Sequence, residues 1–272
     1  MQTIKPLDVA GLLISGLMLL AVGCASPPPP RIPHAEVVRR ELVVGDTLGR
    51  KLDKTLTFSK DQELQVYLKG IAQRLSSVDP KLSSATLKVF VVEDKDGIWR
   101  DFGLPGNRVY LSAGLLKQAE FETEIAAMLA VELAHLARGD VIARMRELLG
   151  LDKPVPGNAK QANEPLPAQP GELLKDLDFF GPDGIFAFSE KTRLDNAAKA
   201  VSLLYAAGFD SRGLLAMWQK FIDFPDHSPL EIDTLDKLVE ATRKAVSSHP
   251  PLRNPVVRSS EFVKMKKRIQ AL

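Results

Sequence analysis

The sequence predicts an α+β fold in which a mostly helical body carries a small mixed or antiparallel sheet. Apolar residues recur at helical spacing over several long segments, and three short strand-like segments follow one another between residues 86 and 112. The chain has 272 residues, of which 45% are hydrophobic and 26% charged, as in ordinary globular proteins. We therefore expect one large domain with appendages.

The first helix is expected to begin after Ser59. Ser59 and Gln62 have the spacing of a capping box, in which two side chains bond to backbone N–H groups at the helix start. Apolar residues then recur at helical spacing up to Asp79-Pro80, where we expect the helix to end. These residues are Leu64, Tyr67, Leu68, Ile71 and Leu75.

Three short strands are expected over residues 86–93, 98–102 and 108–112. The first is rich in β-branched residues, and the third follows the turn signal Pro105-Gly106-Asn107. Short strands so close in sequence predict a small, largely antiparallel sheet.

A long buried helix is expected over residues 122–149, because only Gly139 interrupts a broad apolar stripe. A later helix should end at Gly208, which suits the position after a helix C-terminus, and Ser211 should cap the next one. The later helices are expected over residues 193–207, 211–221, 231–247 and 256–272.

Residues 1–23 have the features of a signal peptide. Their apolar run, residues 9–22, is too short to span a membrane. The sequence Ala21-Val22-Gly23-Cys24 resembles the lipoprotein box of bacterial envelope proteins, which implies cleavage before Cys24 and attachment of lipid to it. The two residues after Cys24 favour sorting to the outer membrane. We therefore expect a chain that is lipid-anchored on the periplasmic face of the bacterial outer membrane.

Prolines define two further segments. Residues 24–34 are rich in proline and are expected to form a stiff tether, followed by a folded domain over residues 35–272. Residues 153–170 contain five prolines, which predicts a surface loop or lid.

Composition excludes two classes of site. The 36 Lys and Arg against 34 Asp and Glu leave a formal charge of +2 without a basic run, so we expect no nucleic-acid partner. The single cysteine excludes an internal disulfide and a cysteine-based zinc cluster.

The long helix carries the segment Val131-Glu132-Leu133-Ala134-His135. It differs at one position from His-Glu-x-x-His, which places two imidazoles one helical turn apart to bind zinc, with the glutamate as general base. Taken alone, Glu132 and His135 would more commonly be a polar pair on a helix.

The surrounding sequence resembles the HtpX-like and CAAX-prenyl-protease-like zinc endopeptidases. The resemblance rests on residues 102–116 (FGLPGNRVYLSAGLL) and 122–140, and it continues over residues 193–197, Ala207-Gly208-Phe209-Asp210 and Ser248-His249-Pro250. It implies a gluzincin-like (minimal zincin) domain whose small sheet lies over the active-site helix. It also implies a zinc site with Glu132 as general base and with His135 and His249 near the metal.

This chain departs from the family at three positions of the implied site. Val131 replaces a histidine ligand, and Arg193 replaces a glutamate ligand. Ala197 replaces an aspartate that orients a ligand histidine. Valine has no donor atom and a guanidinium stays protonated, so His135 is the only matching ligand. We therefore expect no bound metal and a vestigial role for Glu132.

Arg193 is expected to take over the electrostatic role of the missing cation by pairing with Glu132, which would otherwise be buried without a partner. Alternatively, Arg193 is a solvated surface residue. A working zinc site would need substitute ligands, for which the candidates are Glu190, Asp195, Asp140 and His249. Asp195 should point away from Arg193, and Asp140 should cap or decorate a surface turn.

Three functions remain open from the sequence. The first is a lipid-anchored protein with a metallopeptidase-like fold that is catalytically inactive and binds a polypeptide or envelope partner. The second is an active zinc metalloendopeptidase that uses substitute ligands in envelope protein quality control. The third is a purely structural lipoprotein.

Overall fold

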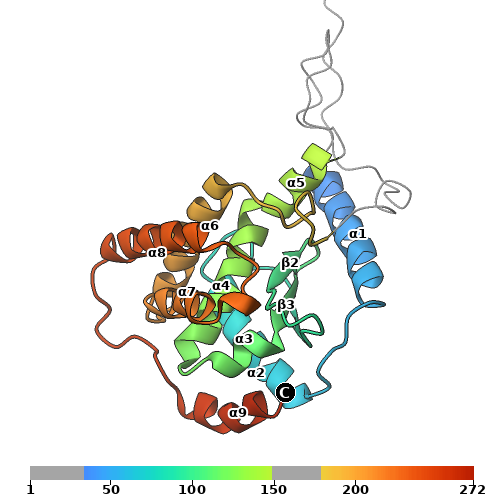
Figure 1. Cartoon of the computed structure of the whole chain (residues 1–272). Coiled ribbons are helices and arrows are strands. Elements are labelled where there is room, and N and C mark those ends of the chain that lie inside the picture. Colours follow the sequence, from blue (N-terminus) through green and yellow to red (C-terminus); the bar gives the residue numbers. More distant parts are fainter. Residues whose placement is uncertain (1–33, 149–178) are drawn as a thin grey trace, which may run out of the picture. The chain divides into compact units, whose positions relative to one another are not determined.

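The computed structural model describes residues 34–148 and 179–272 and confirms an α+β fold (Figure 1). The signal peptide expected over residues 1–23, Cys24, most of the tether and the loop of residues 153–170 lie outside the described residues. Within the two described ranges, no helix has the length and apolar character needed to cross a membrane.

Helices make up most of the described chain. They are α1 (His34–Leu52), α2 (Gln62–Ser76), α3 (Ala113–Gln118), α4 (Glu122–Arg138), α5 (Asp140–Leu148), α6 (Glu190–Ala206), α7 (Gly213–Asp223), the 3-10 helix η3 (Pro225–His227), α8 (Ile232–Ser247) and α9 (Ser260–Gln270).

The sheet has three strands in the order β1 (Lys88–Val92), β3 (Arg108–Ser112), β2 (Phe102–Leu104). β2 and β3 form an antiparallel hairpin, and its turn contains Gly106 and Asn107, both at positive φ. β1 runs parallel to β3, so the sheet is mixed, which is one of the two predicted forms, and not largely antiparallel. The reason is that the chain crosses from β1 to the opposite edge before it returns through the central strand.

Helix α4 lies in the centre of the core and packs against α2, α6, α7 and the strands β2 and β3 (Figure 1). It is buried on nearly all sides, as its broad apolar stripe predicted. However, it ends at Arg138, because Gly139 adopts a left-handed conformation (φ 74°) and its N–H closes the helix on His135 O and Leu136 O. The predicted single helix is therefore two, and α5 starts in a new direction at Asp140.

The expected helix caps are partly wrong. Asp61, not Ser59, caps α2, since its side chain accepts a hydrogen bond from Leu64 N at 3.0 Å. Ser211 does not cap α7, because its hydroxyl donates to Val201 O instead.

Helix α9 begins at Ser260, later than expected, since Val256 forms a β-bridge with Phe209. Helix α6 ends just before Gly208, as predicted, and that glycine has a φ of 76°. It begins earlier than expected because the Ser189 side chain caps it. One face of α6 packs on α4, which brings Arg193 to the same cavity as Glu132.

Candidate functional site

A cavity of about 410 Å³ lies beside α4. Its walls come from α4, α6, α7, α8 and the start of β2, and from the loops before β2, before α6 and before α8. Much of the wall is aromatic, while the polar lining includes two carboxyl groups and two guanidinium groups. The aromatic lining residues are Trp99, Phe102, Phe180, Phe186, Phe188, Trp218 and Phe221.

The structure brings five of the predicted site positions to this one cavity. From α4 come Val131 and two buried polar residues, Glu132 and His135. From α6 come Arg193 and the buried Ala197. The fold therefore brings residues that are more than fifty positions apart in the sequence to one site, as the resemblance implies.

Burial raises the pKa of the Glu132 carboxyl well above its ordinary value. The negative charge of Asp101 adds to this shift, while the backbone N–H of Gly103 and the Arg193 guanidinium oppose it. Asp101 has its own pKa raised to about 7 by burial, although its side chain accepts a hydrogen bond from Ser112 N at 2.7 Å. The cavity thus contains two carboxyl groups that hold protons more tightly than usual.

Arg193 does not form the expected ion pair with Glu132. Its Nε donates to Phe188 O at 3.1 Å, and no nitrogen of Arg193 lies within 4.0 Å of a carboxylate oxygen among the described residues. Burial lowers the pKa of Arg193, and the charge of Glu132 only partly opposes that shift. The two groups therefore act on each other through the cavity without a direct contact, because the Phe188 carbonyl holds the guanidinium.

His135 is held by two neighbours. Its Nδ1 lies 2.8 Å from Asp140 Oδ2, and its ring stacks on Phe188 at a centroid distance of 4.3 Å. Burial lowers the pKa of His135, although Asp140 opposes the shift. Since a carboxylate only accepts hydrogen bonds, the proton of the neutral ring lies on Nδ1. Nε2 has no hydrogen-bond partner in the described part of the chain.

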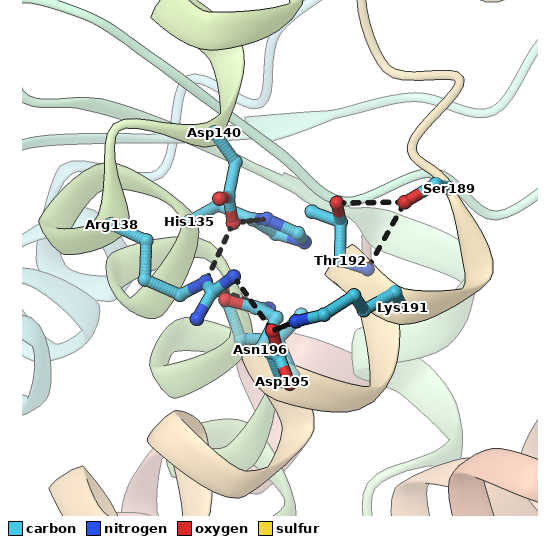
Figure 2. A network of polar contacts seen from close by, with 9 residues as sticks. His135, Arg138, Asp140, Ser189, Lys191, Thr192, Asp195 and Asn196 are labelled. Atoms are coloured by element: carbon cyan, nitrogen blue, oxygen red, sulfur yellow. Dashed lines mark hydrogen bonds and ion pairs between the residues drawn. The ribbon is translucent and has the colours of Figure 1, made fainter.

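Asp140 is also the first member of a series of linked ion pairs, which Figure 2 shows. Its Oδ2 also accepts from Arg138 Nε at 3.1 Å, and Arg138 reaches Asp195 at 3.5 Å. Asp195 in turn pairs with Lys191 at 2.7 Å on the exposed side of α6. Asp140 is buried, so the expectation that it decorates a surface turn is wrong. The reason is the break at Gly139, which turns Asp140 back onto His135.

Asn196 is a buried residue that the sequence analysis did not single out. Its Nδ2 donates to Val131 O at 3.0 Å, which fixes the orientation of the side-chain amide. Its Oδ1 is buried and has no hydrogen-bond partner. Such an orphaned acceptor costs roughly 1–3 kcal/mol, so it deserves a functional explanation.

Other candidate residues do not reach the cavity. His249 stacks on Tyr205, near the C-terminal end of α6, at 4.5 Å and is not part of the cavity wall, which corrects the expectation that it lies beside the site. It lies there because α8 ends at Ser247, beside the far end of α6. Glu190 pairs with Lys237 at the surface.

The comparison with known families agrees with this arrangement. The sequence model of peptidase family M48 matches residues 59–258, which include β1 to β3, α4, α6 and every residue that lines the cavity. The chain belongs to peptidase family M48. No curated protein matches the chain.

Peptidases of family M48 are typically zinc-dependent, but the donor set of this cavity does not fit zinc. Val131 offers no donor, and the positive charge of Arg193 repels a dication. Protein zinc sites need three or four ligands, whereas His135 is the only matching ligand among the cavity residues that the resemblance assigns to the zinc site. Within the described ranges, no group of three or more His, Cys, Asp or Glu side chains could hold a metal ion.

Several lining residues of this M48 domain were missed because their signals were weak. Asn196 lies three residues after Arg193, so helical spacing could have placed both on one face of α6. Four of the 12 phenylalanines fall within residues 179–188, a concentration that marks the aromatic wall. Trp99, which stacks on His227, has no pattern in the sequence that would have revealed it.

Proposed function

We propose that this protein is a non-cleaving member of peptidase family M48 that binds polypeptide in the cavity beside α4, and that it needs no zinc. The observation that carries the proposal is the position of Arg193. It lines the same cavity as Glu132 and His135, at the place where the resemblance implies a zinc ligand. A guanidinium there opposes metal binding and the activation of water by a metal.

The substitutions at the site support one another. Val131 removes one donor, Arg193 removes a second, and Ala197 removes the carboxylate that would steer the missing histidine. All three residues line one cavity. Loss of a ligand together with its supporting residue is what a site released from metal binding would show.

A polypeptide is the ligand class that suits the wall of the cavity. Aromatic side chains from α7 and from the loop before α6 offer apolar contact, and Arg193 and Asn196 offer hydrogen-bonding groups that the protein does not fully use. Function lies in sites that a fold carries, so a chain can retain binding after loss of the chemistry with few changes.

The binding test uses the full chain with fluorescein-labelled casein. We expect a rise in fluorescence anisotropy without cleavage, whether zinc or a chelator is added, and a zinc content well below one ion per chain. Cleavage that is abolished by the chelator and by Glu132→Gln would identify an active peptidase with substitute ligands. Absence of both binding and cleavage would leave only a structural role.

We further propose that Cys24 anchors the protein by a lipid to the periplasmic face of the outer membrane. Cys24 follows the apolar run of residues 9–22, and the first helix that the structure describes, α1, begins at His34. Mass spectrometry should find lipid on Cys24, and the wild-type chain should sediment with outer membranes. Cys24→Ala should move the chain to the soluble fraction. An unmodified Cys24 in the mature protein would contradict this anchor.

A further inference from the structure

Arg193 presents a cationic fork to the cavity. Its Nε is occupied by Phe188 O, whereas its two terminal nitrogens have no hydrogen-bond partner among the described residues. The other basic lining residues are already neutralised or neutral. Arg100 pairs with Asp96 at 2.5 Å, and His135 bonds to Asp140. The unused part of the Arg193 fork has the geometry that binds a carboxylate through two parallel hydrogen bonds.

An unused acceptor accompanies this unused donor. Asn196 follows Arg193 by three residues on α6, so both side chains lie on the face that lines the cavity. The bond from Asn196 Nδ2 to Val131 O leaves Oδ1 as the group without a partner. A ligand that satisfies both residues needs a carboxylate and a nearby N–H group.

The remaining walls are apolar. Met217, Trp218 and Phe221 of α7 and Leu238 of α8 line the cavity, and Trp218 is fixed by a hydrogen bond from Nε1 to Thr242 Oγ1 at 3.0 Å. The volume of about 410 Å³ is near the lower end of the range for ligand pockets, roughly 300–1,000 Å³. The space suits the end of a chain with a bulky side chain better than a long segment.

We propose that the cavity recognises the C-terminal residue of a polypeptide, with the terminal carboxylate on Arg193, the amide N–H of that residue on Asn196 Oδ1, and an apolar side chain against α7 and α8. This inference rests on the proposed polypeptide-binding function and names its ligand. A free terminal carboxylate and an acidic side chain within a chain share the same chemistry, and the test separates them.

The test measures binding of fluorescein-labelled peptides of about ten residues to the full wild-type chain by fluorescence anisotropy. The first peptide ends in phenylalanine with a free carboxylate, and the second ends in the amide of the same residue. The third has an internal glutamate before an amidated end, and the fourth carries an N-methyl group on the terminal amide nitrogen. We expect the first to bind at least about tenfold more tightly than each of the others.

Two variants assign the effect to a residue. Arg193→Gln should abolish the preference for the free carboxylate and leave the weaker apolar binding. Lys191→Gln removes the same charge two residues earlier, from an exposed position paired with Asp195, and should keep the preference. Circular dichroism of each variant verifies folding. The comparison of the four peptides on the wild type does not depend on whether either variant folds.

The results separate this inference from the function on which it rests. Equal binding of the acid and amide peptides by the wild type would overturn the carboxylate site while polypeptide binding stands. Tighter binding of the internal glutamate peptide would overturn recognition of a chain end. Binding of neither these peptides nor casein would overturn both proposals.

Discussion

The Nδ1 atom of His135 lies 2.8 Å from Oδ2 of Asp140, across the break that Gly139 makes between α4 and α5. The two residues are five positions apart, and both are buried. This pair, together with the stack on Phe188, fixes the imidazole ring at the cavity wall. His135, which the resemblance places at a ligand position, therefore has a firm support within its own chain.

Asp140→Asn should lower the pKa of His135 further. Burial already lowers that pKa, and Asp140 is the carboxylate that opposes the shift, so its removal leaves burial without this compensation. Loss of the charged hydrogen bond should also destabilise the fold by roughly 1–3 kcal/mol. NMR titration of the histidine ring protons checks the pKa, and urea denaturation checks the stability.

Asp195→Asn is the matched control, since it removes a carboxylate from the exposed end of the same series of linked ion pairs without touching His135. Its effect on the titration of His135 should be much smaller. An increased or unchanged pKa of His135 in Asp140→Asn would contradict the contact.

Glu132→Gln should make the protein more stable than the wild type at high pH. The folded-state pKa of Glu132 is raised, so the folded state binds the proton more tightly than the unfolded state does. The stabilisation that protonated Glu132 provides is therefore complete below the pKa that Glu132 has in the unfolded state. It is lost as the pH rises through the higher pKa that Glu132 has in the folded state. The melting temperatures of the two proteins should diverge increasingly from about pH 5 to about pH 9.

Asp101, whose pKa is raised to about 7, adds its own loss of stability with rising pH to both proteins, so their difference reports Glu132 together with its repulsion by Asp101. Glu240→Gln on the exposed surface of α8 controls for the removal of one acidic side chain. If the melting temperatures of the wild type and Glu132→Gln stay parallel across the pH range, the described burial of Glu132 is wrong.

Restoring the three missing side chains should create a zinc site. In the triple variant Val131→His, Arg193→Glu and Ala197→Asp, two ligands and a supporting carboxylate join His135 around one cavity. Isothermal titration should detect one zinc ion per chain in the variant and none in the wild type. The same triple variant with His135→Ala should lose the metal. Zinc binding by the wild type at this stoichiometry would refute the argument from its donor set.

Gly213→Ala should destabilise the protein by about 1–3 kcal/mol. A Cβ atom at this position would lie 2.5 Å from Thr123 O, and a backbone atom at the start of α4 cannot easily move aside. Gly70→Ala in α2 is the opposite case, since a Cβ there meets nothing within 4 Å. That change should stabilise the protein by about 1 kcal/mol through helix propensity. Thermal denaturation of both variants checks whether α7 packs this closely on α4.

Most helices were predictable because their pattern is local, but α1 and α3 were not predicted, and neither were the ends of several other helices. Gly139 was included within one long helix, since sequence pattern does not reveal whether a glycine turns left-handed or continues the helix. Ser211 has the chemistry of a cap, yet its hydroxyl is used by Val201 O of a neighbouring segment. Competition among tertiary partners decides such ends.

The members of the candidate site were predictable only in part, since His249 lies elsewhere and Asn196 was missed, and their contacts were not predictable. Position within helices determined that Val131, Glu132 and His135 share one face, and the resemblance added Arg193 and Ala197. Neither the helical positions nor the resemblance predicted the hydrogen-bond partner of Arg193, because the carbonyl of Phe188 comes from a loop whose course depends on packing.

By itself, the sequence determined the family and the places of most helices and of the short strands, and it put valine and arginine where the resemblance implies zinc ligands. Each of these depends on residue identity and local spacing. Only the tertiary structure decided that Asp140 supports His135, that Asn196 Oδ1 has no hydrogen-bond donor, and that Arg193 bonds to Phe188 O and forms no ion pair with Glu132. These are relations between side chains on different elements. Their distances and burial arise when α4, α5 and α6 pack together, and no local pattern in the chain encodes them.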